Sequence, residues 1–167
     1  EAVEAVENWK RKLNAVYEGT ANLVEDDPKS EIQNPKSVLL AWSDLLEKYK
    51  IPQNLPLELM RGVLMDTHIN RYETFEELYV YCYRVASTVG LMSSEIFGYE
   101  KPETLDFAEA LGIAMQLTNI LRDVKDDALM NRIYLPQEDL RRFGVSERQI
   151  FENRRDENFI ELMKFQI

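Results

Sequence analysis

The sequence predicts an all-α fold. Apolar residues recur at helical spacing along most of the 167 residues, and no convincing alternation of apolar and polar residues with turn chemistry predicts a strand. The six glycines and six prolines are expected between the periodic stretches rather than inside them. These patterns predict about seven helices joined by short loops.

Each predicted element has a periodic stretch and a start or stop signal. Gly19, Gly98 and Gly144 are the expected stops, and the capping-box patterns Thr74–Glu77 and Ser146–Gln149 are the expected starts. In order, we expect a helix over Ala2–Tyr17, a loop over Asn22–Pro35, helices over Ser37–Tyr49 and Leu57–Asp66, a long helix from Thr74 to about Phe97, another from about Thr104 to Leu129, a short helix over Pro136–Phe143, and an amphipathic end over Glu157–Ile167.

Length and composition bound the class of protein. The chain suits one domain rather than two, and because neither end carries a helix-capping signal we expect residues 1–167 to be a single partial domain. A net charge of -10 argues against nucleic-acid binding, and anion handling would need metal ions or a local basic cluster. One cysteine, Cys82, fits a reducing, cytoplasmic location, and His68 alone cannot form a histidine-rich metal site.

An acidic row lies on the second long helix. At about 100° per residue, Asn119, Asp123 and Asp127 fall within roughly 80° of one another, with Gln116 one turn earlier. The apolar run Leu111–Leu117 predicts that the row begins at depth in a bundle. Burying two unpartnered carboxylates would cost several kcal/mol each. A divalent cation removes that cost, and ligands that are all oxygen suit magnesium, with manganese as the alternative.

A solvated acidic helix end is the alternative interpretation of this row. Its carboxylates would then pair with Arg122, Lys125 and Arg132. Lys125 projects about 200° from Asp123 and cannot neutralise that face. Asp126 lies on the flank and is expected to be solvated. From spacing alone both interpretations stay open.

Two segments resemble signatures of the phytoene synthase and squalene synthase family, and most closely those of phytoene synthases. The acidic run Gln-Leu-Thr-Asn-Ile-Leu-Arg-Asp-Val from Gln116, followed by Arg-Ile-Tyr-Leu-Pro at 132–136, resembles its second aspartate-rich signature. The run Tyr-Val-Tyr-Cys-Tyr-Arg-Val-Ala-Ser-Thr-Val-Gly-Leu-Met-Ser at 79–93 resembles the other. The resemblance implies an isoprenoid-synthase-type helical bundle that lacks, in this chain, the family's N-terminal and C-terminal helices.

The resemblance also implies site residues. Asn119, Asp123 and Asp127 would be metal ligands, and Gln116 would contact the diphosphate or line the cavity beside it.

Four further residues match the family's reaction centre. Arg132 and Tyr134 resemble its Arg-x-Tyr, in which a cation and a phenol close over the diphosphate. Tyr81 matches a tyrosine that faces the reaction centre, and Asp66 matches an acidic residue on a neighbouring helix. Without the resemblance, Tyr81 would be a core aromatic, and Asp66 and Arg132 helix-end charges.

Four small or apolar residues would line the channel for the prenyl chains: Val85, Ala86, Val89 and Gly90. Small residues one turn apart leave room beside a helix for an alkyl chain. Close packing of two helices explains the same pattern equally well.

The sequence departs from the family in two ways. Ser87 and Lys125 stand where the family usually has glycine, and neither is an implied ligand. The family's first Asp-x-x-x-Asp motif would lie before Glu1, since the acidic segment Asn22–Asp27 lacks that spacing and follows the Trp9 helix.

The implied activity is a magnesium-dependent, head-to-head condensation of two prenyl diphosphates. Geranylgeranyl diphosphate would give phytoene through a cyclopropyl diphosphate. The alternatives are a squalene, dehydrosqualene or presqualene diphosphate synthase that uses farnesyl diphosphate, with NADPH only for squalene, a non-catalytic assembly helper, and a terpene cyclase. Residues 1–167 alone are expected to bind magnesium diphosphate weakly without turnover. Membrane association and oligomeric state stay open.

Overall fold

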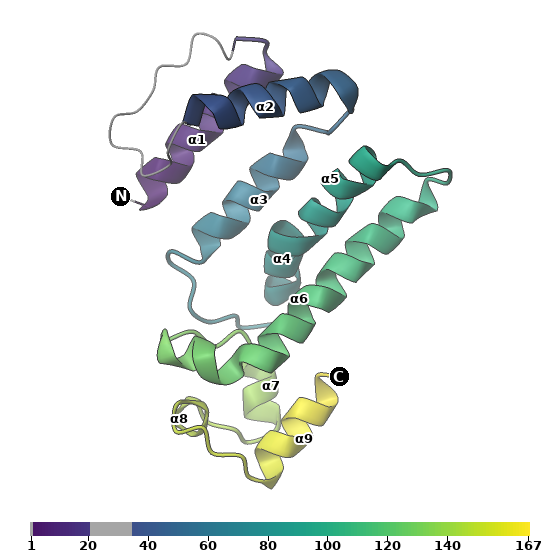
Figure 1. The fold of residues 1–167 in the computed structure, drawn as a ribbon. Coiled ribbons are helices and arrows are strands. Elements are labelled where there is room, and N and C mark those ends of the chain that lie inside the picture. Colours follow the sequence, from purple (N-terminus) through teal and green to yellow (C-terminus); the bar gives the residue numbers. More distant parts are fainter. Residues whose placement is uncertain (1, 21–34) are drawn as a thin grey trace.

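The computed structural model describes residues 2–20 and 35–167. Over these residues its regular secondary structure is helical apart from one isolated parallel β-bridge between Arg71 and Ile133. The elements, shown in Figure 1, are α1 (Ala2–Tyr17), α2 (Pro35–Lys48), α3 (Asn54–Met65), α4 (Phe75–Cys82), a π-helical turn η2 (Tyr83–Ser87), α5 (Thr88–Phe97), α6 (Glu103–Leu129), α7 (Gln137–Arg142), α8 (Glu147–Phe151) and α9 (Glu157–Phe165).

The predicted helices are confirmed with shifts of a few residues. Helices α2 and α3 begin two and three residues earlier than expected, and the loop predicted to begin at Asn22 lies outside the described residues except at its end. The first long helix is confirmed as one continuous rod, α4–η2–α5, with an unpredicted π turn in its middle. The described residues therefore form eight helical rods, one more than the seven or so that the sequence predicts.

Both predicted capping boxes form, one of them in altered form. The Thr74 hydroxyl accepts from the Glu77 N–H (3.3 Å), but the Glu77 carboxylate accepts from the N–H of Glu73 (2.8 Å) instead of Thr74. At α8 the reciprocal bonds of Ser146 and Gln149 are both present. The second box is thus complete, and the first is displaced by one residue.

The expectation that glycines lie outside helices is wrong for Gly62, Gly90 and Gly112, which lie inside α3, α5 and α6. A β-carbon at Gly112 would lie 2.5 Å from the Cα of Ser87, and one at Gly62 would lie 2.7 Å from a methyl group of Val85. Close approach of neighbouring helices therefore needs glycine at these two positions.

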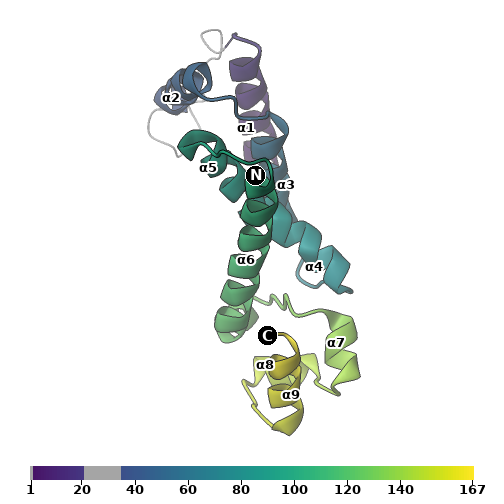
Figure 2. The ribbon, with the colours of Figure 1, turned by 90° about the vertical axis from the view of Figure 1, so that its right-hand side faces the viewer.

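The helices pack along the long helix α6. Helices α5 and α6 lie side by side and antiparallel, and α3 packs against η2 and α5 (Figure 1). Helices α1 and α2 lie at one end of the molecule, and α7, α8 and α9 gather at the opposite end, beside the C-terminal half of α6 (Figure 2). The larger apolar core lies between α4, α6 and these last helices.

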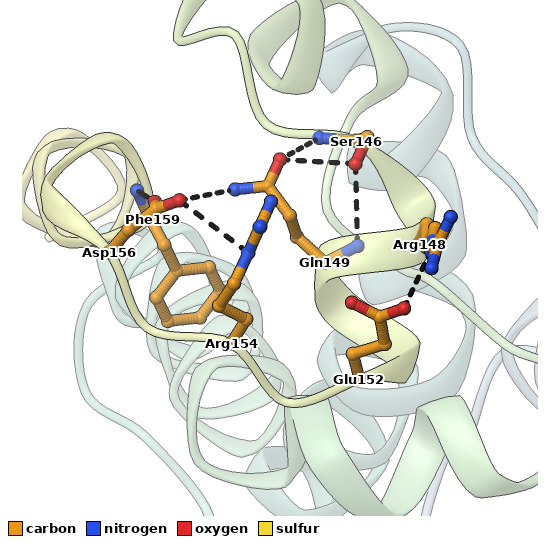
Figure 3. A network of polar contacts seen from close by, with 7 residues as sticks. All are labelled: Ser146, Arg148, Gln149, Glu152, Arg154, Asp156 and Phe159. Atoms are coloured by element: carbon orange, nitrogen blue, oxygen red, sulfur yellow. Dashed lines mark hydrogen bonds and ion pairs between the residues drawn. The ribbon is translucent and has the colours of Figure 1, made fainter.

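A chain of polar contacts fixes α8 to α9 (Figure 3). The side-chain oxygen of Gln149 accepts from the N–H of Ser146 (2.8 Å), and its amide nitrogen donates to Asp156 (2.7 Å). Asp156 in turn caps α9 by accepting from the N–H of Phe159 (3.1 Å). Gln149 is buried, so these bonds satisfy polar groups that water does not reach.

No helix in residues 2–20 and 35–167 is both long and apolar enough to cross a membrane.

An ion pair joins α8 to the loop before α4. The Arg71 Nε donates to Glu147 over 2.7 Å, and this hydrogen bond holds the pKa of the Glu147 carboxyl below its usual range. A lowered pKa stabilises the folded state above the ordinary value of 4.5, and this contribution is lost as the pH falls through the lower folded value. We expect Glu147→Gln to lose up to about 1 kcal/mol of unfolding free energy at pH 7.

The difference between wild type and Glu147→Gln should shrink as the pH falls below 4.5, which urea unfolding at several pH values measures. A difference that stays constant down to pH 3 would contradict this prediction. Glu152→Gln, which removes a solvent-exposed pair with Arg148 from the same helix, is the matched control.

Candidate active site

Asp66 lies at the centre of a polar cluster built by three separate elements. It caps the C-terminus of α3, and its two carboxylate oxygens accept from the hydroxyls of Tyr134 (2.9 Å) and Tyr81 (3.1 Å). The two phenol oxygens lie 3.4 Å apart, and their rings stack with centroids 5.2 Å apart. Tyr81 comes from α4 and Tyr134 from the segment after α6, so only the fold brings them to Asp66.

Burial keeps both phenols protonated. It is the main reason that the pKa of Tyr134 is raised to about 12, with the Asp66 charge acting in the same direction. The pKa of Tyr81 is raised for the same main reason. At physiological pH both hydroxyls are therefore donors to the Asp66 carboxylate.

Arg132 and Asp127 border this cluster. The Arg132 Nη2 donates to the backbone carbonyl of Asp66 over 2.9 Å. Burial, followed by the charge of Asp123, raises the pKa of the Asp127 carboxyl, and Arg132 opposes that shift. Asp127, Arg132 and Tyr134 line a small cavity of about 10 Å³.

Asp123 is more open. Its side chain is 35% exposed and forms a two-pronged ion pair with Arg122, with N–O distances of 2.7 and 2.6 Å. This hydrogen-bonded pair holds the pKa of Asp123 below its usual range. Arg122 was one of the partners in the alternative interpretation of the acidic row, and in this structure that pair exists. Lys125 borders a groove between α6 and α9 that Arg122 also lines.

The expectation that the row begins at depth is wrong for the described residues. Upstream of half-buried Gln116 and Asn119, Phe107, Leu111 and Met115 are 72%, 61% and 59% exposed. No group of three or more histidine, cysteine, aspartate or glutamate side chains in the described part of the chain is placed to hold a metal. At about 40° per four-residue step, exposed Leu111 and Met115 lie within about 80° of Asn119, whereas Phe107 lies about 200° from Asp127.

The four predicted channel residues lie along η2 and α5. Val85 and Ala86 fall in the π turn, and Val85 packs against Gly62 of α3. Val89 is exposed, whereas Gly90 faces the backbone of Ala108 in α6. Gly90 therefore serves close helix packing, and Val89 is the member of the set that faces open space.

Comparison with known proteins shows the family of this chain. The sequence profile of squalene/phytoene synthases matches residues 1–167. The chain belongs to the squalene/phytoene synthase family. It is 40% identical to the 15-cis-phytoene synthase of Synechococcus elongatus over 95% of the chain and 51% of that protein. It is 38% identical to the chloroplastic phytoene synthase of Daucus carota over 98% of the chain and 39% of that protein.

Solved structures in this family share the fold. A squalene synthase from Alicyclobacillus acidocaldarius matches with a TM-score of 0.83 at 23% identity, over 99% of this chain and 58% of that one. A dehydrosqualene synthase in complex with ligand matches with a TM-score of 0.80 at 33% identity, over 96% and 53%. The predicted isoprenoid-synthase-type bundle is confirmed, and the chain spans about half the length of several curated phytoene synthases that it matches.

Sequence reasoning missed Tyr72. This residue is fully buried, and its ring lies 5.5 Å from that of Tyr81 and 5.8 Å from that of Tyr134, so the squalene/phytoene synthase fold here builds a cluster of three tyrosines. Its hydroxyl has no hydrogen-bond partner among the described residues. A single tyrosine in a polar stretch carries no periodic signal, so only the tertiary structure reveals its place.

Asp66→Ala is expected to destabilise the protein. The substitution removes the acceptor of the Tyr81 and Tyr134 hydroxyls, which are then left with only the 3.4 Å contact between their two oxygens. An unsatisfied buried donor costs about 1–3 kcal/mol. We expect a loss of about 2–4 kcal/mol in unfolding free energy, measured by urea denaturation. Tyr81→Phe, which removes one of these bonds but leaves no unpaired donor, should cost about 1 kcal/mol. Equal losses in the two variants would contradict the assigned bonds.

Proposed function

We propose that this chain forms one wall of the active site of a prenyltransferase that joins two prenyl diphosphates head to head, with geranylgeranyl diphosphate as substrate and phytoene as product. The observation that carries the proposal lies on α6, where exposed Leu111 and Met115 are within about 80° of Asn119, the first side chain of the oxygen-bearing row. Such a surface matches a ligand with a long apolar tail and a diphosphate head. Family membership and the relatives named 15-cis-phytoene synthase support the product.

Asn119, Asp123 and Asp127 would hold magnesium. Their fit rests on the donor set and on Asp127, whose ionised form is disfavoured by burial and by neighbouring carboxylates that a cation would neutralise. Magnesium keeps several waters and binds substrate phosphate oxygens, so three protein ligands on one helix suffice for one side of the site. When bound, the metal neutralises charge on the departing diphosphate.

The remaining roles fall to side chains of the Asp66 cluster. Arg132 would donate to diphosphate oxygens through its planar fork. As the allylic C–O bond of the first substrate breaks, its electron pair leaves with the diphosphate, and the cation alkylates the double bond of the second chain. Loss of a proton closes the three-membered ring of the cyclopropyl diphosphate. The stacked rings of Tyr81 and Tyr134 would stabilise positive charge nearby, while Asp66 holds both hydroxyls in place. Departure of the second diphosphate, rearrangement and loss of a second proton then give phytoene.

Gln116 and the channel residues would bind substrate. Gln116 lies one turn before Asn119 and would contact the diphosphate or line the cavity beside it. Val85, Ala86, Val89 and Gly90 would border the prenyl chain, directly in the case of exposed Val89 and by setting the spacing of α5 and α6 in the case of Gly90.

A dehydrosqualene synthase is the second candidate, because a solved structure with that name is 33% identical to this chain. Farnesyl diphosphate would then be the substrate. Residues that set the depth of the channel decide between the two.

Turnover by the complete gene product tests the proposal. The protein is incubated with magnesium and either geranylgeranyl or farnesyl diphosphate, and hydrocarbon and released diphosphate are measured. We expect a C40 hydrocarbon from the first substrate and none after chelation of the metal. Turnover of farnesyl diphosphate alone would replace the phytoene assignment, and no reaction with either would remove the enzyme assignment. Residues 1–167 alone should show no turnover.

A further inference from the structure

Arg71 uses all five of its N–H donors. Its Nε and Nη2 donate to the two carboxylate oxygens of Glu147 over 2.7 and 3.0 Å. Its Nη1 donates to the backbone carbonyls of Asn70 and Asn131, both over 2.7 Å, and Nη2 also donates to the side-chain oxygen of Asn131 over 3.2 Å. Five is the full capacity of a guanidinium, whereas a lysine ammonium has three donors.

These bonds join two loops on either side of the Asp66 cluster. The loop between α3 and α4 follows Asp66, and the loop after α6 carries Arg132 and Tyr134. The two loops run in parallel where Ile133 N–H donates to the carbonyl of Asn70 over 3.0 Å. The bonds that Arg132 and Tyr134 make to Asp66, each 2.9 Å, depend on how these loops lie against each other.

Asn131 connects α6 to the loop that carries Arg132 and Tyr134. Its φ of +59° is in the left-handed region, which a residue other than glycine occupies at some cost in energy. Arg71 donates to both the backbone carbonyl and the side-chain oxygen of Asn131, and these two hydrogen bonds stabilise this conformation. The next residue is Arg132, so the conformation of Asn131 sets the direction in which Arg132 leaves the helix.

We infer that Arg71 is a positioning residue for the active site: it clamps the loop after α6 so that Arg132 and Tyr134 meet Asp66. The inference rests on the proposed function, since it gives Arg71 a role in that same site. The five hydrogen bonds of Arg71 go to Glu147, Asn70 and Asn131 and not to the Asp66 cluster. Arg71 therefore acts through the backbone and not on the substrate.

The test compares Arg71→Lys and Arg71→Met with wild type in the complete gene product. Because the separated loops would no longer align Arg132 and Tyr134 for the transition state, we expect kcat to fall by roughly 10- to 100-fold with KM changed less than about threefold. Hydrogen exchange at the Ile133 amide should accelerate at least about tenfold, with exchange in α4 and α5 unchanged. Arg148→Lys, which changes an 85% exposed arginine on α8, should alter neither readout.

Each other outcome overturns the inference. A rise in KM with unchanged exchange at Ile133 would mean that Arg71 contacts substrate directly. A lower melting temperature with unchanged kcat per folded molecule would mean that the clamp is structural only. If wild type has no turnover, the proposed function fails, and exchange at Ile133 in Arg71→Lys still decides whether Arg71 holds the loop.

Discussion

Asp123→Asn is expected to reduce turnover on the order of 1000-fold while the protein stays folded. The loss follows from the charge of a proposed magnesium ligand, because metal stabilisation of a departing diphosphate contributes several kcal/mol and each 1.4 kcal/mol is a factor of ten. Folding should be unaffected because the Asp123 side chain is partly exposed and pairs with its own neighbour Arg122 near solvent. Exposed ion pairs of this kind contribute at most about 1 kcal/mol.

Turnover, circular dichroism and calorimetric titration with magnesium diphosphate measure the effect. Asp126→Asn is the matched control: it removes the same charge from the same helix, but Asp126 is exposed on the flank of the row. In the complete gene product, we expect magnesium diphosphate binding to be lost in Asp123→Asn and kept in Asp126→Asn. Equal effects in the two variants would mean that the helix acts through general charge rather than through a ligand at position 123.

We expect Gly112→Ala to lower the free energy of unfolding more than the addition of one methyl group at any other position of α6. Its β-carbon would lie 2.5 and 2.6 Å from the backbone Cα and N of Ser87, atoms that cannot rotate away as a side chain can. Overpacking against backbone costs about 3 kcal/mol or more, and the better helix propensity of alanine returns about 1 kcal/mol. The net loss in unfolding free energy should be about 2 kcal/mol or more.

Urea unfolding and thermal melting measure this prediction. Ala110→Leu adds more atoms to the same helix at an exposed position and should stay within about 0.5 kcal/mol of wild type. Turnover should also fall in Gly112→Ala, because pushing α6 away from η2 moves the acidic row relative to Tyr81. A neutral or stabilised Gly112→Ala variant would contradict the close approach of Gly112 to Ser87.

Sequence reasoning placed most helices because their signals are local. The capping boxes at Thr74 and Ser146 and the glycine stops at Gly98 and Gly144 act within one or two turns of the chain. It misjudged Gly112 for the same reason: glycine acts as a breaker in local terms, and its role inside α6 appears only when Ser87 of another helix lies against it. The π turn over Tyr83–Ser87 also has no local signal.

The sequence by itself determined the all-α class, the family and the oxygen-bearing row on α6, because helical period and motif order are properties of neighbouring residues. Tertiary structure alone decided that Asp66 binds two phenols, that Tyr72 completes their cluster and that Arg71 spans two loops and α8. Those contacts join residues up to 76 positions apart, as in the pair of Arg71 and Glu147, and depend on how whole helices pack. Side-chain chemistry can be read along a chain, but which groups meet depends on the burial and approach of distant segments.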